Sequence, residues 1–140
     1  MNFLIKSLTP LFEKTSLKRV SLQNLFKITL TSQFLMFVVI ETKTYQEELD
    51  KWTKADKEAA KKLPQKLSEN PFVGKQLTYK FLREKHIGGR RVYYLIYEDF
   101  NLVLLVATSE KKDQQATIDH IKGNLDDLKA LAEKISKQLS

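Results

Sequence analysis

The chain of 140 residues contains no cysteine. This absence excludes disulfide bridges, thiolate zinc sites and thiol nucleophiles, and it fits a reducing compartment such as the cytoplasm. Long hydrophobic runs are also missing, since the longest one, Phe34 to Ile40, has the length and the residue types of a buried strand. We therefore expect one domain with its own core and no membrane-spanning segment.

Motifs for metals and phosphates are equally scarce. The two histidines, His86 and His120, fall in different predicted elements, and no cluster of acids has the spacing of a metal site. Gly88-Gly89 has the character of a turn, and neither a glycine-rich phosphate loop nor a serine-centred elbow is present. We expect no metal and no cofactor.

Basic residues outnumber acids by 24 to 17, which gives a formal net charge of +7. This charge favours an anionic partner such as nucleic acid, an acidic protein or a lipid surface, although a merely soluble basic protein has the same composition. Residues 1–35 resemble an organellar transit peptide in composition, but Met36 directly precedes the first strand. We therefore favour a poorly ordered extension, or translated sequence upstream of the natural start. The charged residues of this leader are Lys6, Glu13, Lys14, Lys18, Arg19 and Lys27.

Beyond this leader the sequence predicts strands and helices in a regular order. Residues 36–40 form a first strand. Thr44 and Glu47 make a capping box for a first helix, and Thr53 caps a second one. Pro64 lies inside the second helix and should kink or break it.

A hairpin follows around Gly88-Gly89, where both turn positions can adopt positive φ. A two-residue loop fixes the register, so His86 faces Arg91 and Glu84 faces Tyr93. A further strand is expected over residues 101–107. Because side chains alternate between the two faces, the hairpin divides into two sets. One set contains Phe81, Val92, Tyr94 and Ile96 and is the face that we expect helices to cover; the other contains Lys80, Glu84, His86, Arg91 and Tyr93.

The C-terminal region carries a narrow, heptad-like apolar seam. Gly123-Asn124 interrupts it and predicts two helices, with Asn124 capping the second. The seam either packs on its own domain, as most amphipathic helices do, or is offered to a partner or a second copy. Its members are Ile118, Ile121, Leu125, Leu128, Ala132, Ile135 and Leu139.

The polar side chains of the second hairpin face are of the types that cleave or bind phosphodiesters. Glu84 or His86 can take a proton from a ribose 2′-hydroxyl, and Arg91 can bind the phosphate through two hydrogen bonds. Tyr93 can stack on a base. The alternative is structural: Glu84 and Lys80 as solvated edge charges, His86 as a surface residue near a turn, and Tyr93 as a cross-strand packing residue.

The order of elements, with the segments Asn70-Pro71-Phe72-Val73-Gly74-Lys75-Gln76-Leu77 and Gly89-Arg90-Arg91-Val92-Tyr93-Tyr94, resembles the RelE/ParE superfamily of toxins from type II toxin–antitoxin systems. The resemblance covers about residues 36–122. It implies an α+β fold, with a small antiparallel β-sheet and two N-terminal helices packed on one face. Here residues 123–140 add an extended C-terminal helix, and residues 1–35 are the N-terminal extension.

The resemblance also implies a function. Toxins of the RelE branch cleave mRNA in the ribosomal A site without a metal, using the 2′-hydroxyl as the nucleophile, and a cognate antitoxin holds them inactive. We thus expect a cytoplasmic endoribonuclease that inhibits translation, with an antitoxin, the ribosome and mRNA as partners in a toxin–antitoxin hetero-oligomer. The alternatives are a ParE-like or degenerate toxin that binds a protein such as gyrase, and a non-toxic basic RNA- or protein-binding module.

Site residues follow from the same resemblance. Arg91 matches the family's third-strand arginine, and Glu84 lies where some branches place a carboxylate base and others lysines. The expected catalytic residues are Glu84, His86, Arg91 and Lys112, and the expected substrate-binding residues are Lys80, Tyr93 and Lys111. One departure concerns the tyrosine that nuclease branches carry after the last basic residue. Its place is held here by Gln114, Gln115 and Ala116.

Overall fold

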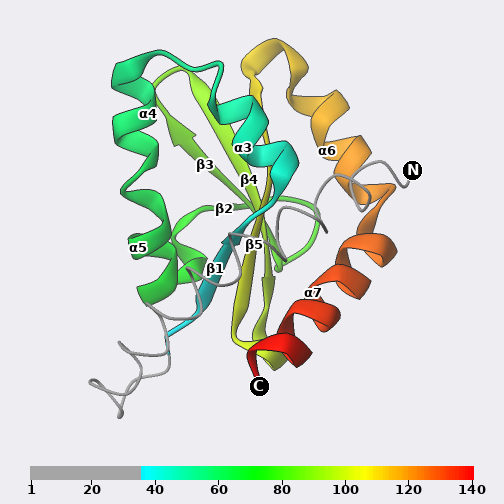
Figure 1. Cartoon of the computed structure of the whole chain (residues 1–140). Coiled ribbons are helices and arrows are strands. Elements are labelled where there is room, and N and C mark those ends of the chain that lie inside the picture. Colours follow the sequence, from blue (N-terminus) through cyan, green and yellow to red (C-terminus); the bar gives the residue numbers. More distant parts are fainter. Residues whose placement is uncertain (1–35) are drawn as a thin grey trace.

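A computed structural model describes residues 36–140, and our expectation for residues 1–35 lies outside this range. One five-stranded sheet in the order β1-β5-β4-β3-β2 separates two layers of helices (Figure 1). Helices α3 to α5 lie on one face of the sheet, and α6 and α7 cover the other. The expected α+β class, with N-terminal helices on one face and a long C-terminal helix, is confirmed.

The strands are β1 (Val38–Glu41), β2 (Lys75–Gln76), β3 (Leu82–Ile87), β4 (Arg90–Tyr97) and β5 (Leu102–Glu110). The α-helices are α3 (Lys43–Leu49), α4 (Lys54–Ala60), α5 (Leu63–Glu69), α6 (Gln114–Lys122) and α7 (Leu125–Leu139). Short 3-10 turns are η2 (Pro71–Val73), η3 (Glu98–Phe100) and η4 (Lys111–Asp113). Strands β2 to β5 pair antiparallel with their neighbours, whereas β1 pairs parallel to β5.

The first helix begins earlier than the sequence predicts. Its N-cap is Thr42 and not Thr44, because the Thr42 hydroxyl accepts a hydrogen bond from the Tyr45 backbone N–H at 3.2 Å. The same hydroxyl donates to the backbone oxygen of Leu105 at 2.9 Å. Thr42 thus caps α3 and fixes it to β5, a contact distant in sequence that a local capping pattern cannot reveal.

The second predicted helix is divided in two. Thr53 caps α4 as predicted, accepting from the Asp56 backbone N–H at 3.2 Å. Pro64 lies in the first turn of α5, where its missing N–H costs no helical hydrogen bond. The predicted break at this proline is therefore confirmed, and three short helices cover the face for which we expected two.

The hairpin register is confirmed over the whole of β3, from Ile87 opposite Arg90 to Leu82 opposite Leu95. Gly88 has a positive φ of 61°, and Gly89 does not. This pattern is the one expected when glycine occupies the first position of a two-residue hairpin loop. The face with Val92, Tyr94 and Ile96 packs under α3 to α5, as predicted.

The other hairpin face, to which the sequence analysis assigned no cover, is buried as well. Tyr93 and Leu95 are fully buried in a second core beneath α6 and α7. The apolar seam of the C-terminal helices provides this cover, so the seam packs on its own domain. Its central members Leu128, Ala132 and Ile135 have no exposed surface. Leu131, which the seam analysis left out, is buried with them.

Glu48 connects α3 to the part of β5 that β1 does not reach. Strand β1 ends opposite Leu105, and three residues later the Thr108 backbone N–H donates to Glu48 Oε1 at 2.7 Å. The Thr108 hydroxyl donates to the same oxygen at 3.3 Å. Burial raises the pKa of Glu48, against the lowering effect of these hydrogen bonds and of the charges on Lys51 and His120.

This raised pKa predicts a pH-dependent stability. A carboxyl with a raised folded-state pKa binds its proton more tightly when folded, so its contribution is present at low pH and is lost as the pH rises through that pKa. Glu48→Gln keeps an acceptor for Thr108 and cannot ionise. We expect the variant to gain stability relative to the parent as the pH rises above 4.5, the ordinary glutamate value, in urea unfolding curves. A difference that does not change with pH would contradict this.

Gly74 predicts a second effect on stability. A Cβ at this position would lie 2.5 Å from Tyr94 Oη and 2.8 Å from the Glu84 backbone oxygen. Tyr94 Oη also donates to Pro71 O at 2.7 Å, so a shift of its ring breaks this hydrogen bond. Gly74→Ala should lower the free energy of unfolding by about 1–3 kcal/mol. Gly89→Ala is the matched control, because no atom lies within 4 Å of its added Cβ; equal losses in both variants would refute the argument.

Candidate functional site

A buried carboxylate, Glu84, lies in the middle of β3 with 1% of its side chain exposed. It pairs with Tyr93 on β4 and with Lys75 on the edge strand β2. Directly paired residues of antiparallel strands share a face, so these three side chains form one row on the side covered by α6. Lys75 lies at the exposed end of this row.

Both oxygens of Glu84 have polar neighbours from three different elements. Oε1 accepts from the side-chain amide of Gln114 at 2.6 Å and lies 3.7 Å from Arg91 Nε. Oε2 lies 3.2 Å from His86 Nε2. A charge with so little exposure to water requires such partners. The four side chains of Glu84, His86, Arg91 and Gln114 are called the Glu84 cluster below.

His86 is the exposed member of the cluster. Its side chain is 57% exposed, whereas that of Arg91 is 12% exposed. When Nε2 carries the proton and donates it to Glu84, Nδ1 becomes an acceptor. A histidine held in this way by a buried carboxylate can accept a proton from a substrate hydroxyl.

Arg91 has a donor without an acceptor. Its Nε is buried and forms no hydrogen bond, although it lies near Glu84. Buried donors of this kind are rare in folded proteins. The side chain therefore lies beside the carboxylate as a charge, and its hydrogen-bonding capacity at Nε is unused.

Tyr93, which pairs with Glu84, lies two residue pairs away from the His86–Arg91 pair in the hairpin. Its hydroxyl forms a 2.8 Å hydrogen bond with the hydroxyl of Ser109 on β5. Burial raises the pKa of Tyr93, and the negative charge of Glu84 acts in the same direction. The Ser109 hydrogen bond and the charge of Arg91 oppose the shift. Tyr93 is thus a neutral, buried phenol, and its ring is not exposed for stacking on a base.

The predicted lysines are distributed differently. Lys111 and Lys112 are exposed in η4, the turn that directly precedes Gln114, so they are near the cluster along the chain. Lys80 lies elsewhere, with its Nζ 5.5 Å from the centre of the Phe72 ring. The structure therefore brings together Glu84, His86, Arg91 and Tyr93, and it does not bring Lys80 to them.

Two residues of this region were missed by sequence reasoning. Gln114 was considered only as a replacement for a tyrosine, yet it makes the shortest contact to Glu84. Its place at the family's aromatic position was the available signal. Lys75 was quoted only within a motif, and it becomes visible as a neighbour of Glu84 once β2 is known to pair with β3.

Neither a metal site nor a membrane span is found in the range 36–140. No three histidine, aspartate or glutamate side chains of these residues gather closely enough to hold an ion. No helix in the same range is both long and apolar enough to cross a bilayer.

Comparisons with known proteins bear on the fold. No protein-family model and no curated protein matches the chain. A solved structure of E. coli toxin RelE, a double-arginine mutant in the free state, aligns with a TM-score of 0.53 at 15% identity, covering 64% of this chain and 97% of that one. The fold is RelE-like. The expected resemblance is thereby confirmed at the level of the fold.

Two toxin–antitoxin complexes align less closely with this RelE-like chain. The RelBE2 complex from Mycobacterium tuberculosis gives a TM-score of 0.49 at 22% identity, covering 54% of this chain and 99% of that one. The intact E. coli RelBE complex gives 0.48 at 16% identity, covering 54% and 95%.

The Glu84 cluster predicts an asymmetry between single and double variants. Arg91→Ala leaves a buried carboxylate without its cation and should cost about 3–5 kcal/mol of stability. Glu84→Gln removes the charge and should cost less. The double variant should be more stable than Arg91→Ala alone, because no buried charge is then left unpaired. Urea unfolding of the four proteins measures the coupling, and additive losses would show that the two side chains do not interact.

Proposed function

We propose that this protein is the toxin of a type II toxin–antitoxin system and cleaves mRNA on the ribosome. The observation that carries the proposal is the Glu84 cluster on a RelE-like sheet: an exposed histidine, held by a buried glutamate, beside an arginine. These are the side chains needed to accept a proton and to stabilise negative charge on a phosphate.

The geometry favours His86 as the base, where the sequence left Glu84 and His86 as alternatives. Both Glu84 oxygens are engaged and its side chain is 1% exposed, so a substrate hydroxyl has no direct access to it. Glu84 instead fixes the His86 ring and stabilises the imidazolium that forms, as a buried carboxylate does in a catalytic triad.

The proposed reaction proceeds at a single phosphodiester. His86 Nδ1 accepts the proton of the ribose 2′-hydroxyl, and the 2′-oxygen attacks the adjacent phosphorus. The bond from phosphorus to the 5′-oxygen of the next nucleotide breaks, and that oxygen leaves with a proton from water. Arg91 and Lys112 stabilise the additional negative charge on the phosphate in the transition state. Lys111 contributes to binding the RNA backbone.

The partners of the proposal are an antitoxin and the ribosome. Two of the similar solved structures are described as toxin–antitoxin complexes. We propose that this chain likewise forms a hetero-oligomer with a cognate antitoxin, and that it acts in the cytoplasm, where the ribosome is. The formal charge of +7 suits a protein that approaches RNA.

A second candidate is a toxin that acts by binding a protein target without cleaving RNA. Gln114 stands where nuclease branches carry a tyrosine, and it occupies Glu84 Oε1 at 2.6 Å. A carboxylate saturated by internal contacts is also what a purely structural cluster contains.

Expression with and without a candidate antitoxin from an adjacent small acidic reading frame, with mRNA 5′ ends mapped by primer extension, tests the proposal. We expect growth arrest and new mRNA ends in the absence of antitoxin. His86→Ala should reduce cleavage about 100-fold or more, since general-base catalysis is lost, while binding to the antitoxin persists. Lys85→Ala, on the same strand but the opposite face, is the matched control and should cleave normally.

Two outcomes would count against this reading. Growth arrest with intact mRNA would refute the nuclease and support the protein-binding toxin. Unchanged cleavage by a folded His86→Ala protein would remove His86 from the base role.

A further inference from the structure

Three large apolar side chains are exposed among residues 36–140, and all three lie in one short segment. Val73 is 44% exposed, and Tyr79 and Phe81 are each 39% exposed. They flank the edge strand β2 and occupy the turn that joins it to β3. Scattered exposed apolar residues are ordinary, whereas a group of them marks a binding surface.

Tyr79 and Phe81 form a stacked pair. Their ring centres are 5.1 Å apart and their planes differ by 2°. The turn that carries them is closed by two backbone hydrogen bonds, from Leu82 N to Tyr79 O and from Leu77 N to Leu82 O, both 3.0 Å. The pair therefore presents flat aromatic surfaces from an ordered turn.

The same segment is basic. Residues 70–83 contain Lys75, Lys80 and Arg83 and no acid. Lys80 and Arg83 both lie over the Phe72 ring, at 5.5 and 5.2 Å from its centre. Arg83 also donates to the backbone oxygens of Lys80 and Gly74, at 2.8 and 3.1 Å, which fixes the turn against η2. Lys75 and Lys80 remain exposed.

We propose that this surface, formed by Tyr79, Phe81, Lys75 and Lys80, binds single-stranded RNA beside the Glu84 cluster. Exposed aromatic rings accept unpaired bases by stacking, and adjacent lysines neutralise the phosphates between them. Residues 70–83 themselves carry no carboxylate, and a segment of exposed rings and cations suits this ligand better than a basic or neutral peptide. The inference rests on the proposed function, because it assigns the surface to the RNA that the cluster would cut.

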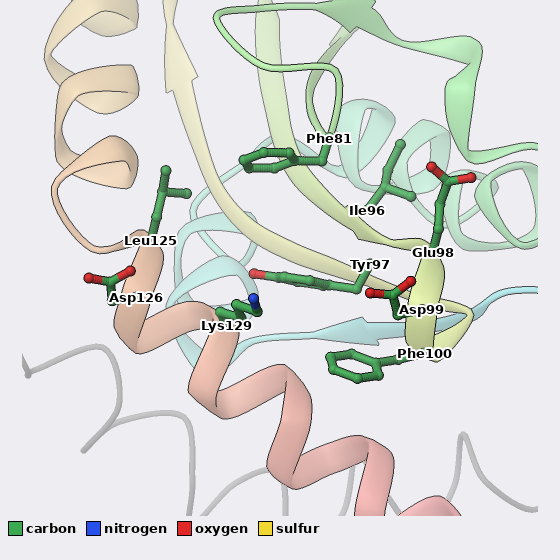
Figure 2. Close-up of a pocket in the computed structure, with 9 residues that line it drawn as sticks. All are labelled: Phe81, Ile96, Tyr97, Glu98, Asp99, Phe100, Leu125, Asp126 and Lys129. Atoms are coloured by element: carbon green, nitrogen blue, oxygen red, sulfur yellow. The ribbon is translucent and has the colours of Figure 1, made fainter.

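Neighbouring acidic side chains restrict the direction in which a bound RNA strand can run. Phe81 borders a cavity of about 450 Å³ with carboxylates on either side of it (Figure 2). Three carboxylates and one cation, Lys129, line this cavity, and its net negative charge favours an RNA backbone that runs away from the cavity and toward Lys75. Lys75 pairs with Glu84 across β2 and β3, so the Lys75 end of the surface adjoins the candidate site, whereas Lys80 lies further from it over the Phe72 ring. The carboxylates belong to Glu98, Asp99 and Asp126.

Binding of a fluorescein-labelled 12-nucleotide oligouridine to the full-length protein, followed by anisotropy, tests the inference. Tyr79→Leu and Phe81→Leu keep apolar bulk but lose the ring, and each should raise Kd roughly 5- to 100-fold. Lys75→Ala and Lys80→Ala should each reduce the slope of log Kd against log salt by about 0.7. Lys137→Ala is the control: it removes an exposed lysine of α7, outside the proposed surface, and should leave Kd within about twofold.

The outcomes separate this inference from the proposed function. Unchanged Kd in both ring variants, or equal affinity for a duplex of the same length, would overturn the RNA surface even if the protein cleaves mRNA on the ribosome. Loss of antitoxin binding with unchanged RNA affinity would assign the surface to a protein partner instead. Weakened oligouridine binding in the ring variants, in a protein that cleaves no mRNA, would support the surface and refute only the nuclease. Urea midpoints near that of the parent confirm that the variants fold.

Discussion

A carboxylate removed from water on strand β3, next to the edge strand of the sheet, connects the hairpin to the C-terminal helices. Glu84 is 1% exposed on its side chain, and a charge in such a place is stable only when partners surround it. Those partners come from β3, β4 and the first residue of α6, so one side chain joins the hairpin to the C-terminal helices. The Gln114 amide joins the start of α6 to this carboxylate, while Ile118 and Ile121 of the same helix pack into the core that covers Tyr93.

Much of the sheet could be predicted because its determinants are local. A two-residue Gly-Gly loop fixes the register of β3 on β4, and the alternation of side chains then assigns every residue of the hairpin to a face. The break at Pro64 and the cap at Thr53 are local in the same sense. The hairpin register alone predicts that Glu84, His86 and Arg91 lie on one face of the sheet, without reference to any tertiary contact.

The remaining features depend on contacts between distant residues. Thr42 caps α3 because its hydroxyl also reaches Leu105, 63 residues away, and the nearer Thr44 pattern cannot compete with that contact. Local patterns do not predict that the second hairpin face is buried, because the C-terminal seam that covers it, which includes Leu128, is distant in sequence. The contact of Gln114 with Glu84 could not be predicted for the same reason, since the two residues lie 30 positions apart. A sequence pattern names the residues of a face but not what covers it.

Burial of the carboxylate also changes how its chemistry is divided. A solvent-exposed glutamate can act as a base in its own right, whereas the buried Glu84 contacts the exposed His86, to which we assign that role in the proposed reaction. In the proposed reaction the substrate approaches from the side of His86 and Lys75, since the Gln114 amide of α6 already occupies Glu84 Oε1. The exposed rings of Tyr79 and Phe81 lie on the turn that follows Lys75 in the chain. If the proposed function holds, one buried charge thereby restricts both the atom that accepts the proton and the edge of the sheet from which RNA approaches it.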